Sequence, residues 1–362
     1  MIMRKKGNSQ TCDFFEDAVS PSILDGKACP TESFRRELGV RLSLLKYISF
    51  FLFLFQSTLI ANAQLKWTNV DSLFQPLPNS IHVFKTTDPL DGKPNIAFYV
   101  IADLKDKNIL FDADTTFKRR FTPLQFYQEN NKPLVVVNCT FFSFQTNQNL
   151  NVVIKDGKIL SHNLKTLDRK TGDSIKRVRL FRSALGINKN RKADVAWIRT
   201  DSSLRHAAAT QSPPIQGMWF TKNSRFDATN HYEGNNFNRW NVETAVGGGP
   251  VLIQTGKINI TNEHEFMFTG EAIKDKHPRT AMGYTNDDKL IILVIQGRAP
   301  GIAEGATLVQ EAQILKDLDC HEALNLDGGG SSCMLVNGKE TIKPSDLTGQ
   351  RPVPAVFLIR RK

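Results

Sequence analysis

The sequence predicts an α+β fold in which mixed, largely antiparallel β-sheets with hairpins are flanked by a few helices. Three stretches, 152–160, 250–260 and 333–341, each contain an apolar run, a two-residue turn that ends in glycine, and a lysine that opens a second run. This order is typical of β-hairpins. A fourth hairpin is predicted over 282–295, with its turn at 286–287. The chain is therefore rich in antiparallel strand pairs.

Two further strands and two helices are predicted in chain order. Runs of β-branched and apolar residues predict strands over 95–102 and 133–138. Between them, 122–128 is predicted to form a short helix with proline at its first position. The clearest helix covers 307–318, where Thr307 and Gln310 form a capping box.

The N-terminal 63 residues are predicted to be an upstream extension followed by a secretory signal peptide. Basic residues, an apolar run and the triplet Ala61-Asn62-Ala63 lie within 41–64, so cleavage is expected between Ala63 and Gln64. The polar residues 1–40 lie unusually far in front of such a signal, and we expect translation to begin near Val40. The apolar run is short for a membrane span, so we expect a periplasmic or secreted protein without a stable span in the mature chain, a membrane anchor being the alternative.

Proline content and periodicity divide the rest of the chain into two parts. Residues 64–94 contain Pro76, Pro78 and Pro89 and little periodicity, so they are expected to form an N-terminal docking arm or loop. Residues 95–362 are expected to form the functional domain.

The charge balance favours an anionic partner. Lys and Arg number 47 against 36 Asp and Glu among the 362 residues, and hydrophobic residues make up 40% of the chain. Phosphorylated sugars, acidic glycans and nucleic acid are candidates, with ordinary surface charge as the alternative. The sequence has no zinc-finger spacing, no block of basic residues and no aromatic RNA-binding signature, so nucleic acid is excluded.

A polar pair precedes the most glycine-rich stretch of the sequence. Asn325 and Asp327 alternate with Leu324 and Leu326, so a strand here buries the leucines and presents the amide and the carboxylate on the other face. Two oxygen ligands fall short of a cation site. No cofactor is therefore assigned, and a divalent cation stays an open alternative.

The glycine run that follows is predicted to bind an anion. Gly328, Gly329 and Gly330 permit positive φ angles and expose successive backbone N–H groups, and Ser331 adds a hydroxyl donor. Such a run forms an anion-binding nest. The alternative is a turn that only connects two strands. A second glycine-rich corner precedes the strand at 250, and it contains Gly248 and Gly249.

The strand predicted over 133–138 ends in a polar residue followed by aromatic residues. Asn138 leads through two residues into Phe141 and Phe142. An amide at a strand end beside exposed rings is a candidate sugar pocket, for which Asn138 and Phe142 are selected. The alternative is a buried turn with phenylalanines in the core.

The helix predicted over 307–318 carries an acid on its apolar face. Glu311 lies on the same stripe as four apolar residues, and a carboxylate is not expected there without a partner. It is either the structural partner of an arginine or a site acid whose pKa is raised by burial. The stripe consists of Leu308, Ala312, Leu315 and Leu318.

Four motifs in this order resemble the phosphodiester glycosidase family. They are H-P-R-T-A-M-G (277–283), L-I-I-L-V-I-Q-G-R (290–298), the helix that carries Glu311, and A-L-N-L-D-G-G-G-S-S (323–332). The resemblance covers about 95–362. It departs from the usual pattern where Cys139-Thr140 replaces two glycines before the phenylalanines, and where Gln296 replaces an aspartate.

The resemblance implies a hydrolase that cleaves the glycosidic bond of a sugar-1-phosphodiester. A phosphorylated sugar or glycan is then the partner. Two alternatives stay open: an exported glycan-binding or cell-envelope protein without turnover, and a glycosidase that acts on ordinary glycosidic linkages.

The chemistry of this reaction assigns roles to the candidate residues. The leaving phosphate monoester has a second pKa of about 6, so stabilisation of its charge matters more than its protonation. Arg279 is the candidate phosphate clamp, or else the structural partner of Glu311. Asp327 is the first choice as base or nucleophile, and Glu311 is the second catalytic carboxylate. The candidate substrate-binding residues are Arg279, Arg298, Asn325, Gly328, Gly329, Gly330, Ser331, Asn138, Phe142, Gly248 and Gly249.

Overall fold

The computed structural model describes residues 64–171, 174–202, 205–213, 231–232 and 235–362. The predicted signal peptide lies outside these residues. Every strand pair that they form is antiparallel, and helices are few. The expected largely antiparallel architecture is confirmed, but the described sheets are not mixed and the fold is mainly β.

The largest sheet has eight strands and contains most of the motifs singled out above. In sheet order these strands are β1 (Thr68–Asn69), β2 (Ile81–Thr86), β3 (Ala97–Asp103), β20 (Lys289–Ile295), β19 (Arg279–Thr285), β21 (Cys320–Asn325), β17 (Val251–Gln254) and β18 (Lys257–Ile258).

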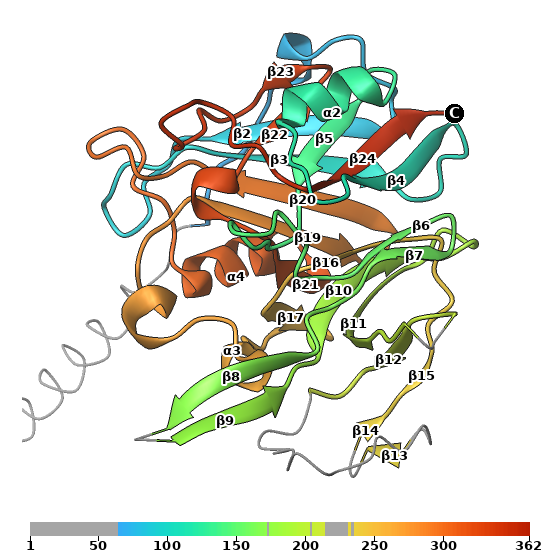
Figure 1. Cartoon of the computed structure of the whole chain (residues 1–362). Coiled ribbons are helices and arrows are strands. Elements are labelled where there is room, and N and C mark those ends of the chain that lie inside the picture. The colour runs from blue at the N-terminus through green and yellow to red at the C-terminus, as the bar shows by residue number, and fades with distance from the viewer. Residues whose placement is uncertain (1–63, 172–173, 203–204, 214–230, 233–234) are drawn as a thin grey trace, which may run out of the picture. The chain divides into compact units, whose positions relative to one another are not determined.

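Two further large sheets and two isolated hairpins complete the strands (Figure 1). The seven-stranded sheet contains β15 (Asn238–Arg239), β12 (Ala208–Thr210), β11 (Ala193–Arg199), β10 (Arg182–Ile187), β16 (Thr244–Gly247), β6 (Val153–Lys155) and β7 (Lys158–Ser161). The five-stranded sheet contains β23 (Lys339–Glu340), β22 (Met334–Val336), β5 (Val135–Asn138), β24 (Ala355–Arg361) and β4 (Ile109–Thr115). The two-stranded pairs are β8 (Thr166–Thr171) with β9 (Ser174–Arg179), and β13 (His231–Tyr232) with β14 (Asn235–Asn236).

The described helices are short and lie beside the sheets. The predicted helix over 307–318 is confirmed as α4, with the expected capping box at Thr307, and it lies against β21 and β17 (Figure 1). The predicted short helix is confirmed as α2, which lies beside β5. The helices are α2 (Pro123–Glu129), α3 (Asn262–Glu265) and α4 (Leu308–Asp317), with 3-10 turns η1 (Asp71–Leu73), η2 (Gly270–Ile273) and η3 (Gly329–Ser331).

The central strands of the eight-stranded sheet are buried on both faces. In β20, Leu290, Ile292 and Val294 pack into a core shared with the other two large sheets, whereas Ile291 and Leu293 pack towards α4. This explains why the run L-I-I-L-V-I has no polar residue. The doubly buried strands form a rigid base for the residues at their ends.

The register of the sheet brings the ends of four strands together. Arg279, the first residue of β19, pairs with Ile295, the last residue of β20. Asn325, the last residue of β21, pairs with Ala281 near the start of β19, and β17 begins beside the end of β21. The loops that carry the predicted site residues therefore meet at one end of the sheet.

The four predicted hairpins are confirmed as β6–β7, β17–β18, β19–β20 and β22–β23. The expectation for 64–94 was wrong in one respect, because this segment is not only a loop: β2 pairs with β3 along its whole length. Pro89 lies beyond the end of β2, and the cis bond before Pro76 precedes it, so the prolines flank the strand instead of interrupting it.

Candidate functional site

The strand ends surround a pocket of about 200 Å³. Residues from five separate segments form its wall, and six of the sequence-predicted site residues are among them. The lining consists of Phe141, Phe268, His277, Arg279, Arg298, Asn325, Leu326, Asp327, Gly328 and Gly329.

Asp327 is held in the pocket wall through its backbone. Its N–H donates to the Cys139 carbonyl at 2.8 Å, and its carbonyl accepts from Nδ2 of Asn138 at 2.6 Å. Leu326, its neighbour, is fully buried in the core, and Asn325 and Asp327 on either side of it line the pocket. The carboxylate therefore projects from a fixed backbone.

The carboxyl group of Asp327 has a higher pKa than an ordinary aspartate. Burial in the pocket wall raises its pKa to about 7. A hydrogen bond from the Ser331 side chain, the charge of Arg351 and the backbone of Gly328 oppose this rise. A carboxyl group that titrates near neutral pH exchanges protons under ordinary conditions, which suits a base.

Three basic side chains face the same pocket. Arg279 is 3% exposed, and its Nε and Nη2 donate to the carbonyls of Ala306 and Asp275 at 2.9 and 3.2 Å. The charges of Arg279 and Arg298 add to burial in lowering the pKa of His277, so the three groups are close. His277 is therefore neutral at pH 7, and the two guanidinium groups supply the positive charge.

Glu311 lies behind the pocket wall and does not line it. Its side chain is fully buried, and neither carboxyl oxygen has a hydrogen-bond partner among the described residues. Burial raises its pKa to about 8, with the charge of Arg279 opposing the rise. The carboxyl group is thus largely protonated at pH 7 and does not neutralise Arg279. Because Glu311 is absent from the pocket lining, we do not assign it the catalytic contact with substrate that the sequence suggested.

Asn325 presents one unpaired acceptor to the pocket. Its Nδ2 donates to the Gly249 carbonyl at 2.8 Å, whereas its Oδ1 is buried without a hydrogen-bond partner among the described residues. A buried acceptor of this kind is costly unless a ligand donates to it. Asn325 therefore offers a specific contact to a hydroxyl or N–H group.

The second glycine-rich corner positions Asn325 and lies outside the pocket lining. A side chain at Gly248 would lie 2.4 Å from the Asn325 carbonyl, and the Gly249 N–H donates to that same carbonyl at 2.8 Å. The prediction that Gly248 and Gly249 contact substrate is corrected: they allow two strands to approach closely.

The predicted anion-binding nest is wrong in its details. The N–H group of Gly329 donates to the Pro278 carbonyl at 2.8 Å, and those of Ser331 and Ser332 donate to the carbonyls of Gly328 and Gly329 at 3.2 and 3.3 Å. These three donors are used within the protein and are not available to a ligand. The anion-binding capacity of the pocket rests on guanidinium groups instead.

Two of these glycines leave room for arginine side chains. A side chain on Gly329, whose φ is +62°, would lie 3.0 Å from Nη2 of Arg298, and one on Gly330 would overlap the guanidinium of Arg351. Gly328 and Gly329 line the pocket. Gly330 and Ser331 are buried and do not line it. The run is glycine-rich because cationic side chains pack on its backbone.

The predictions for Asn138 and Phe142 are also corrected. Asn138 is fully buried, and its Oδ1 accepts from Thr280 Oγ1 and the Cys333 N–H, both at 3.0 Å. Phe142 packs into the core beneath the five-stranded sheet. Its neighbour Phe141 lines the pocket, since consecutive residues of an extended chain point to opposite sides.

Sequence reasoning missed three functional candidates. His277 belongs to the quoted motif H-P-R-T but was given no role, and Phe268 and Arg351 lie outside all quoted motifs. A histidine two residues before the proposed clamp was a usable signal. Nothing in the local sequence marks Phe268 or Arg351.

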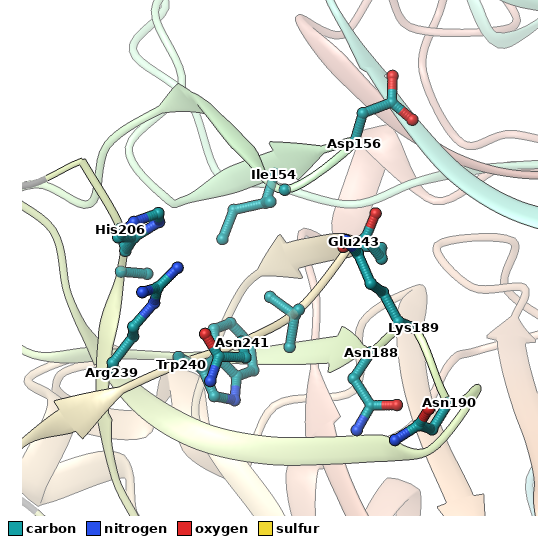
Figure 2. A pocket seen from close by; sticks show the side chains of 13 residues that line it. Ile154, Asp156, Asn188, Lys189, Asn190, His206, Arg239, Trp240, Asn241 and Glu243 are labelled. Carbon is teal, nitrogen blue, oxygen red and sulfur yellow. The ribbon is translucent and has the colours of Figure 1, made fainter.

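A larger pocket of about 460 Å³ lies on the seven-stranded sheet. His206 and Arg239 lie on one side of it and Asn188 and Asn190 on the other (Figure 2). None of the sequence-predicted site residues lines it. Because the predicted site residues gather in the smaller pocket, we regard that pocket as the better candidate.

Two features of the described residues bear on cofactors and membranes. No group of three or more His, Cys, Asp or Glu side chains is placed to hold a metal ion in the part of the chain that the structure describes. Within the same residues, no helix combines the length and the apolar character needed to cross a bilayer.

Two curated relatives are similar to short segments of this chain. The mouse N-acetylglucosamine-1-phosphodiester alpha-N-acetylglucosaminidase is 37% identical over 68 residues, which are 19% of this chain and 13% of that protein. The SPbeta prophage-derived uncharacterized protein YomE of Bacillus subtilis is 36% identical over 80 residues, which are 22% and 12% of the two chains. The chain thus matches about an eighth of the length of these relatives.

A solved structure and a family model extend the similarity over most of the domain. A hypothetical protein from Synechocystis is similar in fold, with a TM-score of 0.54 and 16% identity, over 83% of this chain and 65% of that one. The sequence model of the phosphodiester glycosidase family matches residues 131–360, which include every residue that lines the pocket. The chain therefore belongs to the phosphodiester glycosidase family.

Proposed function

We propose that this protein is an exported hydrolase that cleaves the glycosidic bond of a sugar-1-phosphodiester, releasing the sugar and a phosphomonoester. One observation carries the proposal: the carboxyl group of Asp327 shares a pocket with the guanidinium groups of Arg279 and Arg298. Family membership supports it, and the similarity to the mouse N-acetylglucosamine-1-phosphodiester alpha-N-acetylglucosaminidase favours an N-acetylglucosamine-1-phosphodiester as the type of substrate.

Arg279 and Arg298 bind the phosphodiester group. A phosphodiester carries one negative charge, and the leaving phosphomonoester gains a second as the bond breaks. Guanidinium groups offer paired donors to two oxygens, and they act most strongly where charge develops in a partly desolvated pocket. Because Glu311 is largely protonated, it leaves the charge of Arg279 available to the phosphate.

Asp327 either activates water or attacks the anomeric carbon. Both roles need the ionised carboxylate, because positive charge develops on the sugar ring in the transition state. The pKa of about 7 means that roughly half of the molecules are ionised at neutral pH. The leaving group has a pKa of about 6 and needs little protonation, so a second carboxylic acid is not required in the pocket.

Two neighbours position the substrate. The unpaired Oδ1 of Asn325 accepts a hydrogen bond from a sugar hydroxyl or amide, and neutral His277 contacts the phosphate oxygens through a ring N–H. Glu311 acts through Arg279 as a positioning residue.

The pocket lining disfavours a glycosidase for ordinary linkages. Such enzymes need a carboxylic acid for the alcohol leaving group as well as a second carboxylate. Among the described lining residues, Asp327 is the only carboxyl group. Gln296, where the family pattern has aspartate, lies outside the lining, and its Oε1 accepts from the Lys343 N–H at 2.9 Å.

The test is hydrolysis of a panel of sugar-1-phosphodiesters that differ in sugar and aglycone, with aryl glycosides as the comparison. We expect turnover of at least one phosphodiester, and we expect Asp327→Asn to lower kcat by about 10²-fold or more. Asp156→Asn, a change in the larger pocket, is the matched control and should leave kcat unchanged. Binding without turnover would favour the glycan-binding alternative, and loss of activity in Asp156→Asn would move the site to the other pocket.

A further inference from the structure

A second pocket of about 170 Å³ adjoins the candidate active site. The two pockets share Phe141 and Phe268, whose ring centroids are 6.0 Å apart in an edge-on arrangement. A ligand in one pocket therefore reaches the other past this aromatic pair. The second pocket is lined by Phe141, Leu150, Asn151, Leu164, Arg182, Met267 and Phe268.

The walls of this second pocket are mainly apolar. All five of its apolar side chains are partly exposed. The amide of Asn151 is already used, because its Oδ1 accepts from the Phe141 N–H at 3.1 Å and its Nδ2 donates to the Gly248 carbonyl at 3.0 Å. Exposed apolar walls gain free energy when an apolar group covers them.

Arg182 is the one polar group of the second pocket that has donors to spare. A guanidinium carries five N–H groups. Among the described residues, the guanidinium of Arg182 makes one hydrogen bond, from Nη2 to the Phe266 carbonyl at 3.1 Å. The nearby carboxylate of Glu265 accepts four hydrogen bonds, from Thr261, Val251, and the N–H and Oγ of Ser183. Burial lowers the pKa of Arg182, and the charge of Glu265 opposes this shift.

This combination excludes a polyhydroxylated ring as the occupant. Several hydroxyl groups buried against leucine, methionine and phenylalanine would lose hydration without gaining partners. An apolar group that ends in a single hydrogen-bond acceptor or an anion fits this pocket better. Its apolar part packs on the walls, and its polar end accepts hydrogen bonds from the guanidinium of Arg182.

We propose that this second pocket is a substrate subsite for an apolar acyl or alkyl group that carries a carbonyl or carboxylate, which Arg182 binds. The proposal rests on the function proposed above, in which the first pocket holds the phosphate and the reacting carbon. The group belongs either to an acyl substituent of the sugar or to the aglycone beyond the phosphate, and Phe141 and Phe268 are then specificity-determining residues.

Binding of alkyl phosphates tests the subsite without any requirement for turnover. Methyl phosphate, hexyl phosphate and 6-(phosphonooxy)hexanoate share the phosphate and differ in what reaches the second pocket. By calorimetry, we expect hexyl phosphate to bind at least about tenfold tighter than methyl phosphate, because several methylenes are buried. We expect the terminal carboxylate to tighten binding further.

Variants assign these differences to the second pocket. Leu164→Trp fills it and should remove the preference for hexyl over methyl phosphate, whereas Leu160→Trp, on the exposed face of β7, should preserve that preference. Arg182→Lys retains a charge without the forked donors and should remove most of the gain from the carboxylate. Met267→Trp repeats the filling experiment if Leu164→Trp does not fold.

The outcomes separate the subsite from the proposed function. Equal binding of the three phosphates by the wild-type protein, or an unchanged preference in the filled variants, overturns the subsite. A comparison of kcat/KM for phosphodiesters with a longer sugar acyl group and with a longer aglycone then shows which part of the substrate enters it. If no phosphodiester is hydrolysed, the proposed function fails while the binding experiment still decides the subsite.

Discussion

The replacement Glu311→Gln tests the electrostatics of the wall behind the pocket. Glu311 is fully buried on α4, and both carboxyl oxygens lack hydrogen-bond partners among the described residues. Glutamine has nearly the same size and shape as protonated glutamic acid but cannot ionise. The variant therefore differs from the wild-type protein mainly when the pH is high enough to remove the proton.

The magnitude follows from the difference between folded and unfolded pKa values. The folded pKa of Glu311 is about 8 and the reference value is 4.5, so between these values the folded protein holds a proton that the unfolded chain has lost. Stability therefore falls as the pH rises, by about 1.4 kcal/mol per pH unit well inside this window. From pH 5 to pH 7 the free energy of unfolding falls by about 2.5 kcal/mol through the ionisation of Glu311. The slope is smaller near pH 5, because Glu311 is still partly protonated there in the unfolded chain.

Urea unfolding at pH 5, 6 and 7, followed by the fluorescence of buried Trp197 and Trp240, measures this term. The two proteins should differ by less than about 1 kcal/mol at pH 5, and the glutamine variant should gain about 2.5 kcal/mol relative to the wild-type protein by pH 7. Glu263→Gln, at an exposed position of α3, is the control and should follow the wild-type pH dependence. A Glu311→Gln difference that stays constant from pH 5 to pH 7 would show that Glu311 ionises as it does in water, which refutes the reasoning.

Three further predictions concern the pocket and the N-terminus. The kcat of the wild-type protein should rise with pH through about 7, as the carboxyl group of Asp327 ionises; a kcat that is flat from pH 5 to 9 would contradict its role as base or nucleophile. Gly329→Val should weaken phosphate binding because the new side chain displaces the Arg298 guanidinium, whereas Gly256→Val, at a similar positive φ but with open space around it, should bind phosphate normally and lose only about 1–3 kcal/mol of stability. N-terminal sequencing of exported protein should begin at Gln64, and a start upstream of the apolar run would contradict the predicted signal peptide.

The secondary structure was predictable where local rules decide it. The hairpins have turn residues that fix the strand pairing, and α2 and α4 begin at threonines whose capping boxes are visible in the sequence. β4 and β24 were not predicted, because each is recognisable mainly by its partner 240 or more residues away along the chain. Long-range pairing of this kind leaves no local signal.

The candidate site was predictable in outline and not in detail. Asn325, Asp327 and Arg279 line the pocket because the strand period and the sheet register bring them to one end of the sheet. Phe142 was selected where Phe141 lines the pocket, since the direction of an extended chain after a strand depends on tertiary contacts.

The glycine run shows why composition alone misled. Its backbone donors looked free in the sequence, but the folded chain supplies the Pro278 carbonyl to Gly329 and arginine side chains to the faces of the glycines. Arg351 comes from a segment with no motif, so its effect on Asp327 was visible only in the fold.

The position of bond cleavage tests the central proposal most directly. Hydrolysis of an N-acetylglucosamine-1-phosphodiester in water enriched in oxygen-18 places the label on the atom that water attacks, whether water attacks the substrate itself or a covalent glycosyl-enzyme intermediate. We predict that the released phosphomonoester contains no label, because attack at the anomeric carbon breaks the carbon–oxygen bond and leaves all phosphate oxygens unchanged. Label in the phosphomonoester, detected by mass spectrometry, would show cleavage of a phosphorus–oxygen bond and contradict the assignment of this pocket as the site of a glycosidase.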